Sequence, residues 1–386
     1  METEKVAGPV TRPRVALLAT GLNLGGAETQ LTRLATWLVR QECPVRVISL
    51  LPAGYFGPVL EQHGVDVHSL GMRRGKANAR AFFSASRALR AWRPLILCSF
   101  AYHANLLGRL VGRMARIPVI ISSIRNERFG GRWRDLVMRL TDPLSDATVV
   151  NCRAVANALA ARGVTPASRL VVIPNAIDIL DAGDAGMNPA PDRAVVGVGA
   201  SDFVWISVGR LEEQKDYPSL LRAFARVCAE PRKAHLLIVG AGDPVPLQRL
   251  TMTLGISGSC QFLGERHDVR GLLRMADAFV IASAWEGLPN SVMEALLAGR
   301  PVVGTRVGGI PELVLDGVHG FLVPARQSEA LAHAMLRLMQ LPSARRDAMG
   351  AEGRSFVIRE YPLERVACQW LDLFNRLLFR WPGDPK

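Results

Sequence analysis

The chain has 386 residues, 49% of them hydrophobic and 21% charged, which is typical of a globular protein too long for one core. No window holds about 18 uninterrupted apolar residues, and residues 1–10 lack an apolar signal core, so we expect neither a transmembrane helix nor export. Residues 1–180 hold 24 Lys and Arg against 11 Asp and Glu, whereas residues 181–386 hold 23 of each. A basic first half indicates an anionic partner (nucleic acid, membrane surface or phosphorylated substrate) or simply an arginine-rich wetted surface.

Six cysteines are spread along the chain without paired spacing. They are Cys43, Cys98, Cys152, Cys228, Cys260 and Cys368. This distribution argues against a disulfide framework or a zinc site, and it is typical of a protein from a reducing cytoplasm.

Short apolar segments alternate with helical periodicity through the first half. The predicted strands are 14–20, 45–51, 65–70, 95–100, 118–124, 148–151 and 170–173. The predicted helices are 29–40, 79–92, 104–115 and a segment that ends at Arg162. Strands that alternate with helices predict a parallel, doubly wound sheet.

The same alternation restarts after residues 181–200, a stretch rich in Gly, Ala, Asp and Pro that we interpret as a linker. The predicted strands are 204–208, 235–239, 260–263, 278–282, 301–304 and 320–323. The predicted helices are 218–228, 246–254, 269–275, 292–298, 310–315, 328–339 and 363–379. We therefore expect two domains, 1–180 and 201–360, and a helical end at 361–386. The carboxyl ends of the strands in both domains would face a shared cleft.

Two carboxylates flank a predicted helix start in the second half. Glu286 lies on the turn after strand 278–282, and Glu294 lies in the first turns of the next helix, for which Asn290 and Ser291 are suitable N-caps. Helical side chains lean toward the N-terminus, where free N–H groups and the helix dipole favour phosphate. A phosphate seat between two hydroxyl-accepting carboxylates suits a sugar nucleotide. The alternative is that both glutamates are solvated surface charges.

Cations and glycines follow other strands. Arg210 and Lys215 come just after strand 204–208, where they could grip a diphosphate or be solvated loop charges. Glycine loops at 21–26, 240–242 and 308–309 could bend around a phosphate or sugar, or be plain tight turns. None fits the dinucleotide fingerprint, which argues against a nicotinamide dehydrogenase.

Polar and basic residues also close strands in the first half. His103 could bind a sugar hydroxyl or transfer a proton, or it could be structural, and Arg125 could meet a phosphate. Residues 72–92 and 128–140 mix arginines with bulky apolar side chains. Each is either a basic amphipathic surface for an anionic membrane or a core-packed helix with a wet basic face. No nucleic-acid motif accompanies the charge, so a nucleic-acid partner is not expected.

Several motifs together carry a resemblance to a known family. They are the Glu-x7-Glu pair Glu286 and Glu294, Gly-Gly-Ala-Glu at 25–28, Gly-Arg-Leu…Lys at 209–215 and Gly-Gly-Ile-Pro-Glu…Gly-Phe-Leu-Val from 308 to 323. The chain resembles the retaining, nucleotide-sugar-dependent glycosyltransferases of family 4 over nearly its whole length, most strongly over 204–324. The resemblance implies the GT-B fold, with two Rossmann-like, doubly wound parallel-sheet domains facing a central cleft. It also implies that the helix 363–379 packs back on the N-terminal, acceptor-binding domain.

The resemblance implies a metal-independent sugar transfer with retention at the anomeric carbon and no cofactor, since the nucleotide-sugar is a co-substrate. The acceptor hydroxyl would attack from the leaving-group face, and a diphosphate oxygen would take its proton. Glu286 matches the glutamate that holds donor-sugar hydroxyls, Glu294 the one that holds the ribose, and Arg210 and Lys215 the diphosphate clamp. Further donor contacts are expected at Gly25, Gly26, Gly240, Phe262, Leu263, Leu288, Asn290 and Ser291.

The acceptor side departs from the family pattern. Many members carry a histidine after the strand that here ends at Ile124, and this chain has Arg125 nearby instead. His103, on the preceding strand, is a substitute candidate, and Asn23 is the third acceptor-side candidate.

We therefore predict a cytoplasmic transferase that moves a hexose-type sugar from a UDP- or GDP-linked donor in cell-surface glycan biosynthesis. Its acceptor would be a lipid-linked or polysaccharide precursor at the anionic inner face of the plasma membrane. One alternative is a GT-B enzyme with a soluble acceptor or phosphate sugar. Another is a catalytically silent GT-B fold that binds a partner through its basic face. The set of Glu286, Glu294, Arg210 and Lys215 argues against the silent fold.

Overall fold

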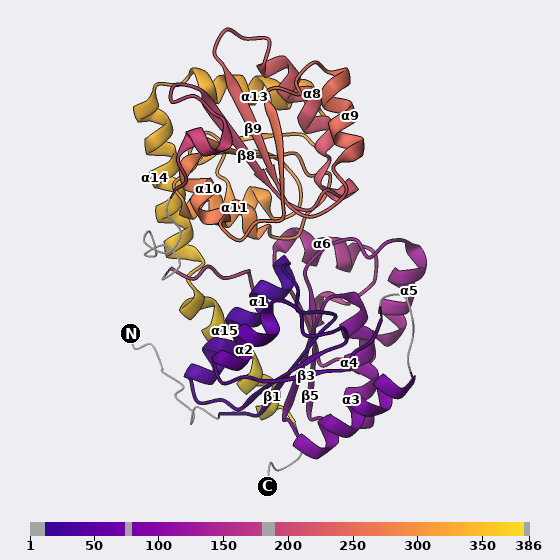
Figure 1. The fold of residues 1–386 in the computed structure, drawn as a ribbon. Helices are drawn as coiled ribbons and strands as arrows, with labels where there is room; N and C mark the ends of the chain where they lie inside the picture. The colour runs from indigo at the N-terminus through magenta and orange to yellow at the C-terminus, as the bar shows by residue number, and fades with distance from the viewer. Residues whose placement is uncertain (1–11, 74–78, 180–189, 382–386) are drawn as a thin grey trace, which may run out of the picture. The chain divides into compact units, whose positions relative to one another are not determined.

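The structure, a computed structural model, describes residues 12–73, 79–179 and 190–381. Two compact units make up the chain (Figure 1). Unit 1 contains Met1–Ala176 and Leu363–Lys386, and unit 2 contains Ile177–Pro362. Each unit is built on one parallel sheet flanked by helices, which confirms the predicted α/β class with two doubly wound sheets.

Unit 1 has a seven-stranded sheet in the order β3-β2-β1-β4-β5-β6-β7. The strands are β1 Val15–Ala19, β2 Val45–Ser49, β3 Asp66–Ser69, β4 Ile96–Phe100, β5 Val119–Ile124, β6 Ala147–Val150 and β7 Leu170–Val172. Every pair is parallel, and Val15 lies opposite both Val45 and Ile96. The strand order reverses between β1 and β4, the switch point where ligands of open α/β sheets bind.

Helices cover both faces of this sheet because residues on alternate positions of β1 point to opposite sides. Leu17 belongs to a core shared with α1 Gly26–Arg40, α2 Phe56–Gln62 and α15 Leu363–Phe379. Leu18 belongs to a second core shared with α3 Ala79–Trp92 and α4 Tyr102–Met114. The remaining helices of unit 1 are α5 Arg132–Thr141, η1 Asp142–Leu144, α6 Arg153–Ala161 and η2 Ala167–Arg169.

Unit 2 has a six-stranded parallel sheet in the order β10-β9-β8-β11-β12-β13. The strands are β8 Phe203–Val208, β9 Ala234–Val239, β10 Cys260–Gly264, β11 Ala278–Ile281, β12 Val302–Thr305 and β13 Gly320–Val323. The helices are η3 Arg193–Val196, η4 Glu213–Lys215, α8 Tyr217–Val227, α9 Val245–Thr253, α10 Val269–Met275, α11 Asn290–Leu297, α12 Ile310–Leu313, α13 Ser328–Gln340 and α14 Ser343–Glu360. Phe203, Trp205 and Phe224 are fully buried in its core.

The helices α2 and α14 are among those that the sequence analysis did not predict. In α14 the interior glycines Gly350 and Gly353 weaken helix propensity. Packing against α11 explains them, because a Cβ at Gly350 would lie 2.0 Å from the Gly299 carbonyl oxygen and one at Gly353 would lie 2.6 Å from Leu296 Cδ2. Glycine thus permits a close helix contact that sequence periodicity does not reveal.

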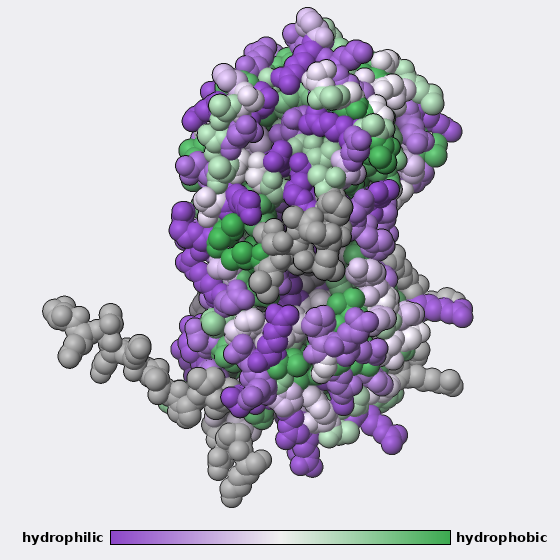
Figure 2. Space-filling view, turned by 60° about the vertical axis from the view of Figure 1, so that its left-hand side comes forward, coloured by the Kyte–Doolittle hydropathy of each residue, from purple (hydrophilic) through white to green (hydrophobic). Residues whose placement is uncertain are grey.

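Two segments were predicted to bound the domains, the linker 181–200 and the helix 363–379. Of the expected linker, residues 181–189 lie outside the described part, while Arg193 forms an ion pair with Asp277 (3.0 Å) in unit 2. Helix α15 lies in unit 1, where Trp370 is buried against Phe100 with ring centroids 5.9 Å apart. On the side drawn in Figure 2, hydrophilic residues (purple) predominate and hydrophobic ones (green) form small groups.

Candidate functional site

The loops at the carboxyl edge of the unit 2 sheet are joined by backbone hydrogen bonds. Leu211 N–H donates to the Ala241 carbonyl (2.8 Å), which links the loops after β8 and β9. Ala284 N–H donates to the Gln214 carbonyl (2.8 Å), which links the loops after β11 and β8. Three strand ends, those of β8, β9 and β11, therefore present their loops as one connected surface, which includes Arg210, Lys215, Gly240 and Glu286.

Glu286 is the centre of this surface. It is 5% exposed, and its Oε1 accepts hydrogen bonds from Lys215 Nζ (2.5 Å) and Ser283 Oγ (2.8 Å). Its Oε2 accepts one from Gln214 Nε2 (2.9 Å), while Thr305 Oγ1 holds the Ser283 carbonyl (2.7 Å). A buried carboxylate is tolerated when it is paired and hydrogen-bonded, and these donors fix its orientation. The structure thus brings the predicted residues Lys215 and Glu286 together.

Gln214 and Ser283 were missed by the sequence analysis. Both lie directly beside predicted site residues or strand ends, and this adjacency was the only signal available. The hydrogen bond from Gln214 to Glu286 depends on the pairing of β8 with β11, whereas Ser283 lies on the same loop as Glu286.

The second predicted cation lies elsewhere. The Arg210 side chain is 64% exposed, and it pairs with Glu212 at 3.0 Å. The loop supplies this carboxylate two residues away, so the local ion pair keeps Arg210 at the surface. The two members of the expected diphosphate clamp therefore have different surroundings, one buried against Glu286 and one solvated.

Two glycines of these loops are needed for loop packing. Gly240 has φ of +152°, and a Cβ there would lie 2.1 Å from the Gly209 carbonyl oxygen. Gly308 has φ of +52°, and a Cβ there would lie 2.2 Å from the Glu286 carbonyl oxygen. The backbone of the Glu286 loop is therefore clamped by the loop after β12.

Helix α11 begins at this surface. Its first residue is Asn290, which was itself predicted to be the N-cap. Pro289 is the N-cap and makes no side-chain capping bond, so the expectation that Asn290 or Ser291 caps the helix was wrong. Proline has no N–H to leave unsatisfied and favours the extended conformation seen here, with ψ of 121°. Leu288 is buried before it, and Glu294 is half-buried in its first turns. N–H groups of the first turn have no intrahelical acceptor.

Two of the expected donor contacts, Phe262 and Leu263, lie on β10. Phe262 and Leu263 are half-buried, and the pairing of β10 with β9 shifts register between Phe262 and Gly264. Gly240 N–H donates to the Gly264 carbonyl (2.8 Å), which ties this strand end to the glycine loop after β9.

In unit 1 the glycine loop after β1 starts a helix earlier than predicted. Gly25 is the N-cap of α1, so the helix begins at Gly26 and not at residue 29. A Cβ at Gly25 would lie 2.3 Å from Glu28 Oε2, so glycine leaves room for this carboxylate. Asn23 and Gly26 are exposed in this loop.

His103 was expected on a strand end and lies in the first turn of α4, because this helix starts at Tyr102. Its ring is exposed and packs edge-on against Tyr102, with centroids 5.1 Å apart. Partial burial lowers the pKa of His103, and the nearby Arg134 lowers it further, so the neutral imidazole is favoured. Ala101 before it has φ of +71°, a strained value for a residue with a Cβ.

Arg125 lies at the neighbouring strand end and is already engaged. Its guanidinium lies 5.1 Å from the Phe100 ring centroid and 5.7 Å from that of Trp370. Its Nη1 donates to Asn175 Oδ1 (3.0 Å), and Asn151 Nδ2 donates to the Arg125 carbonyl (3.3 Å). Burial lowers the pKa of Arg125 to about 10. The analysis of the sequence missed Asn151 and Asn175, although polar residues at or just beyond the ends of predicted strands were a usable signal.

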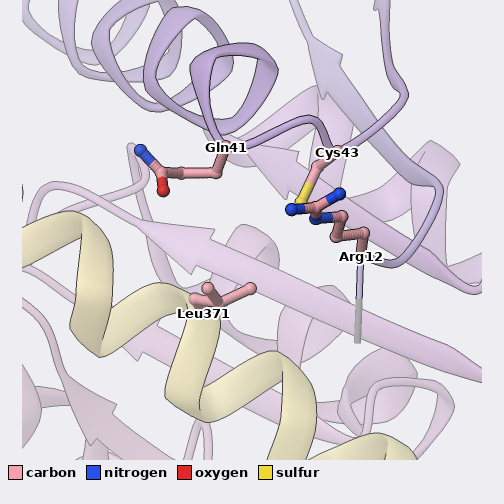
Figure 3. A pocket seen from close by; sticks show the side chains of 4 residues that line it. All are labelled: Arg12, Gln41, Cys43 and Leu371. Atoms are coloured by element: carbon pink, nitrogen blue, oxygen red, sulfur yellow. The ribbon is translucent and has the colours of Figure 1, made fainter. Parts of the chain in front are cut away.

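A hollow elsewhere in unit 1 is lined by Arg12, Gln41, Cys43 and Leu371 (Figure 3). Arg12 precedes β1 and Cys43 precedes β2, so the hollow lies at the amino ends of the strands. The residues considered above follow the carboxyl ends, so this hollow is not part of the candidate site.

Within residues 12–73, 79–179 and 190–381, no three His, Cys, Asp or Glu side chains are grouped so that they could hold a metal ion. No helix of the same described part has the length and apolar character needed to cross a bilayer.

Two parallel α/β sheets in separate units, with connected loops and a held carboxylate at the carboxyl edge of the second, define a protein of the two-domain GT-B class. Two family models match the chain. Residues 25–176 match the "Glycosyl transferase 4-like domain", and residues 202–341 match "Glycosyl transferases group 1". The first of these matches lies in unit 1 and the second in unit 2.

Curated relatives carry glycosyltransferase names. The lipopolysaccharide core biosynthesis glycosyltransferase LpsE of Rhizobium meliloti is 30% identical over 185 residues, which are 48% of this chain and 53% of LpsE. The UDP-Gal:alpha-D-GlcNAc-diphosphoundecaprenol alpha-1,3-galactosyltransferase of Escherichia coli is 24% identical over 272 residues, 67% of this chain and 70% of that protein. Alignments to several such relatives span about half of the relative's length.

Solved structures agree in fold. Anabaena HepE in complex with UDP and glucose has a TM-score of 0.82 at 21% identity, and the match covers 94% of this chain and all of that chain. At this identity the likeness shows the fold alone, which is that of GT-B glycosyltransferases.

Proposed function

We propose that the chain is a retaining, metal-independent glycosyltransferase of family 4 that transfers a hexose-type sugar from a UDP- or GDP-linked donor. The observation that carries the proposal is the buried Glu286 carboxylate, held by Lys215 beside the start of α11. The HepE complex, whose fold this chain shares, contains UDP and glucose, which supports a nucleotide-sugar donor.

The hydrogen bonds of Glu286 suit the recognition of one sugar hydroxyl. A carboxylate has about four lone-pair positions for hydrogen bonds. Lys215, Ser283 and Gln214 occupy three of them. One position is left for a donor-sugar hydroxyl, whose O–H would donate to Glu286.

The diphosphate would bind at the first turn of α11, where N–H groups and the helix dipole stabilise negative charge. Arg210 would leave Glu212 to meet it, since an exposed ion pair is worth about 0–1 kcal/mol and is readily exchanged. Glu294, one turn into the helix, would accept from the ribose hydroxyls. Charge that develops on the leaving diphosphate would thus be stabilised by the N–H groups already in place at the start of α11 and by the recruited Arg210.

Retention in this proposal needs no enzyme nucleophile. The acceptor hydroxyl attacks the anomeric carbon from the face that the diphosphate leaves, the carbon–oxygen bond to the diphosphate breaks, and a diphosphate oxygen takes the acceptor's proton. Glu286 is already bound by Lys215, which favours a positioning role over covalent attack.

We propose a lipid-linked or polysaccharide-precursor acceptor in cell-surface glycan biosynthesis. The names of the relatives support this, since one acts in lipopolysaccharide core biosynthesis and another is named for a diphosphoundecaprenol-linked acceptor. The acceptor would bind at the carboxyl edge of the unit 1 sheet, near Asn23, His103 and Arg125.

Thermal shift with UDP, GDP, ADP, CMP and NAD tests the donor site. One nucleoside diphosphate should stabilise the wild type, by about 2.7 kcal/mol at 100 times its Kd. Glu294→Ala should lose the shift, and Glu230→Ala, which removes an exposed carboxylate of the same unit, should keep it. No shift with any nucleotide in a folded sample would contradict the proposal and favour the silent fold.

Transfer itself is then measured with sugars on the selected nucleotide and a polyprenyl-diphosphate-sugar acceptor. The anomeric configuration of the product, read by NMR, tests retention. Activity that survives EDTA supports metal independence, and activity that EDTA abolishes and a divalent cation restores would overturn that part.

A further inference from the structure

Helices α3, α4 and α5 lie side by side on one flank of unit 1 (Figure 1). Large apolar side chains protrude from all three of them. These are Phe83 on α3, Leu110 and Met114 on α4, and Trp133, Leu136 and Leu140 on α5. We call this surface the α3–α5 face. Exposed apolar side chains that gather on neighbouring helices mark an interaction site more often than scattered single residues do.

On α5 the apolar residues form one stripe. Trp133, Leu136 and Leu140 are spaced i, i+3 and i+7, so they lie on the same side of the helix. Met138, which is fully buried, lies on the opposite side. Trp133 is 73% exposed and Leu140 is 68% exposed. The stripe therefore points away from the fold and does not stabilise it by burial.

The same segment is strongly basic. Residues 79–141 contain 12 arginines and no lysine, against two acidic residues. One of these, Asp135, is paired with Arg162 at 3.3 Å. In the described part of the chain no carboxylate pairs with the exposed side chains of Arg116, Arg132 or Arg139.

We propose that the α3–α5 face docks on a membrane surface of anionic phospholipids. Trp and Leu side chains would enter the boundary between headgroups and acyl chains, while neighbouring arginines stay among the phosphates. Charge complementarity selects this occupant, because among the described residues the face has unpaired cations around an apolar stripe and its one carboxylate, Asp135, is paired. The inference goes beyond the proposed sugar transfer, since docking requires neither donor nor acceptor.

Flotation of the full chain with vesicles of phosphatidylcholine, alone or with 30% phosphatidylglycerol, tests the apolar part. The chain should float with the anionic vesicles only. The Trp133→Ser/Leu140→Ser variant should lower the partition coefficient at least tenfold. The matched control Val195→Ser/Met252→Ser replaces two equally exposed apolar residues of unit 2 and should leave it unchanged.

Arginine variants test the electrostatic part. Arg132→Ser/Arg139→Ser should lower partitioning roughly 25-fold at low salt, since each arginine near an anionic surface is worth about 1 kcal/mol, or fivefold. Arg222→Ser/Arg249→Ser removes two exposed arginines of unit 2 and should have little effect. Equal binding to neutral vesicles, or equal losses in test and control variants, would overturn the proposal.

Light scattering after size exclusion distinguishes a second copy of the chain as the occupant. A wild-type dimer that becomes monomeric in Trp133→Ser/Leu140→Ser, with no vesicle binding by either, would overturn the membrane proposal. Nucleotide binding is measured on the same samples without lipid. If the wild type binds no nucleotide, the result counts against the proposed function alone. If the wild type does not float with anionic vesicles, the result counts against the docking face alone.

Discussion

Each unit holds a cation near the carboxyl edge of its sheet, and the two cations are held differently. In unit 2, Lys215 donates to the buried carboxylate of Glu286 at 2.5 Å. In unit 1, Arg125 lies over the rings of Phe100 and Trp370 and bonds an amide oxygen. The first arrangement cancels charge and orients a carboxylate. The second leaves the positive charge uncancelled, because among the described residues no carboxylate pairs with Arg125. Unit 2 therefore holds a paired carboxylate at this edge, whereas unit 1 holds a cation over aromatic rings.

Removal of the Trp370 ring, which packs against Phe100 and Arg125, should have the largest effect on the free energy of unfolding. Trp370→Ala should cost about 3–5 kcal/mol of unfolding free energy, since Trp370 is 3% exposed between α15 and the unit 1 sheet. Trp133→Ala, in the same unit but exposed, should change it by less than about 0.5 kcal/mol. Urea unfolding followed by circular dichroism measures both. Similar losses in the two variants would break the comparison.

Removal of the Glu286 carboxylate should have the second-largest effect on the free energy of unfolding. Glu286→Ala leaves Lys215 without its partner and should cost about 3 kcal/mol, as for other buried ion pairs that lose one member. Glu286→Ala/Lys215→Met should recover part of this loss, because it removes the unpaired charge. A double-mutant cycle in urea measures the coupling energy. Additive effects of the two substitutions would show that the pair does not stabilise the fold as described.

Clamping of the Glu286 loop by Gly308 should have a smaller effect. Gly308→Ala and Gly317→Ala both place a Cβ at positive φ, at a cost of about 1 kcal/mol each. Only Gly308→Ala adds a clash with the Glu286 carbonyl, worth about 1–3 kcal/mol more, because nothing lies within 4 Å of a Cβ at Gly317. Thermal unfolding compares the two variants, and equal shifts would contradict the clamp.

The smallest expected effect concerns pH. Burial lowers the pKa of His319, which is 2% exposed and stacks on Phe356. The unfolded chain takes up a proton below about pH 6.5 while the folded chain does not. Stability should therefore be full above this pH and fall as pH drops toward the lowered pKa. His319→Asn should flatten the change in unfolding free energy between pH 7.5 and 5.5, and an unchanged slope would assign the dependence to other groups.

Local pattern was enough to predict the two parallel sheets and most of their helices. Alternation of apolar strands with periodic helices is determined by neighbouring residues, so the strand 320–323 and the helix 269–275 were predicted with the bounds that the structure has. The same local reasoning put Glu286 and Lys215 on loops after strands, where the parallel topology brings loops together. Their roles toward a donor stay a prediction.

Tertiary structure decided what depends on contacts between distant segments. Gln214 and Glu286, 72 residues apart, meet only because β8 and β11 pair. Trp370 reaches Arg125 from the far end of the chain, and α14 forms despite Gly350 because that glycine lets it approach α11. Periodicity shows which face of a segment is apolar, whereas these contacts depend on which segments pack together and how closely their backbones approach.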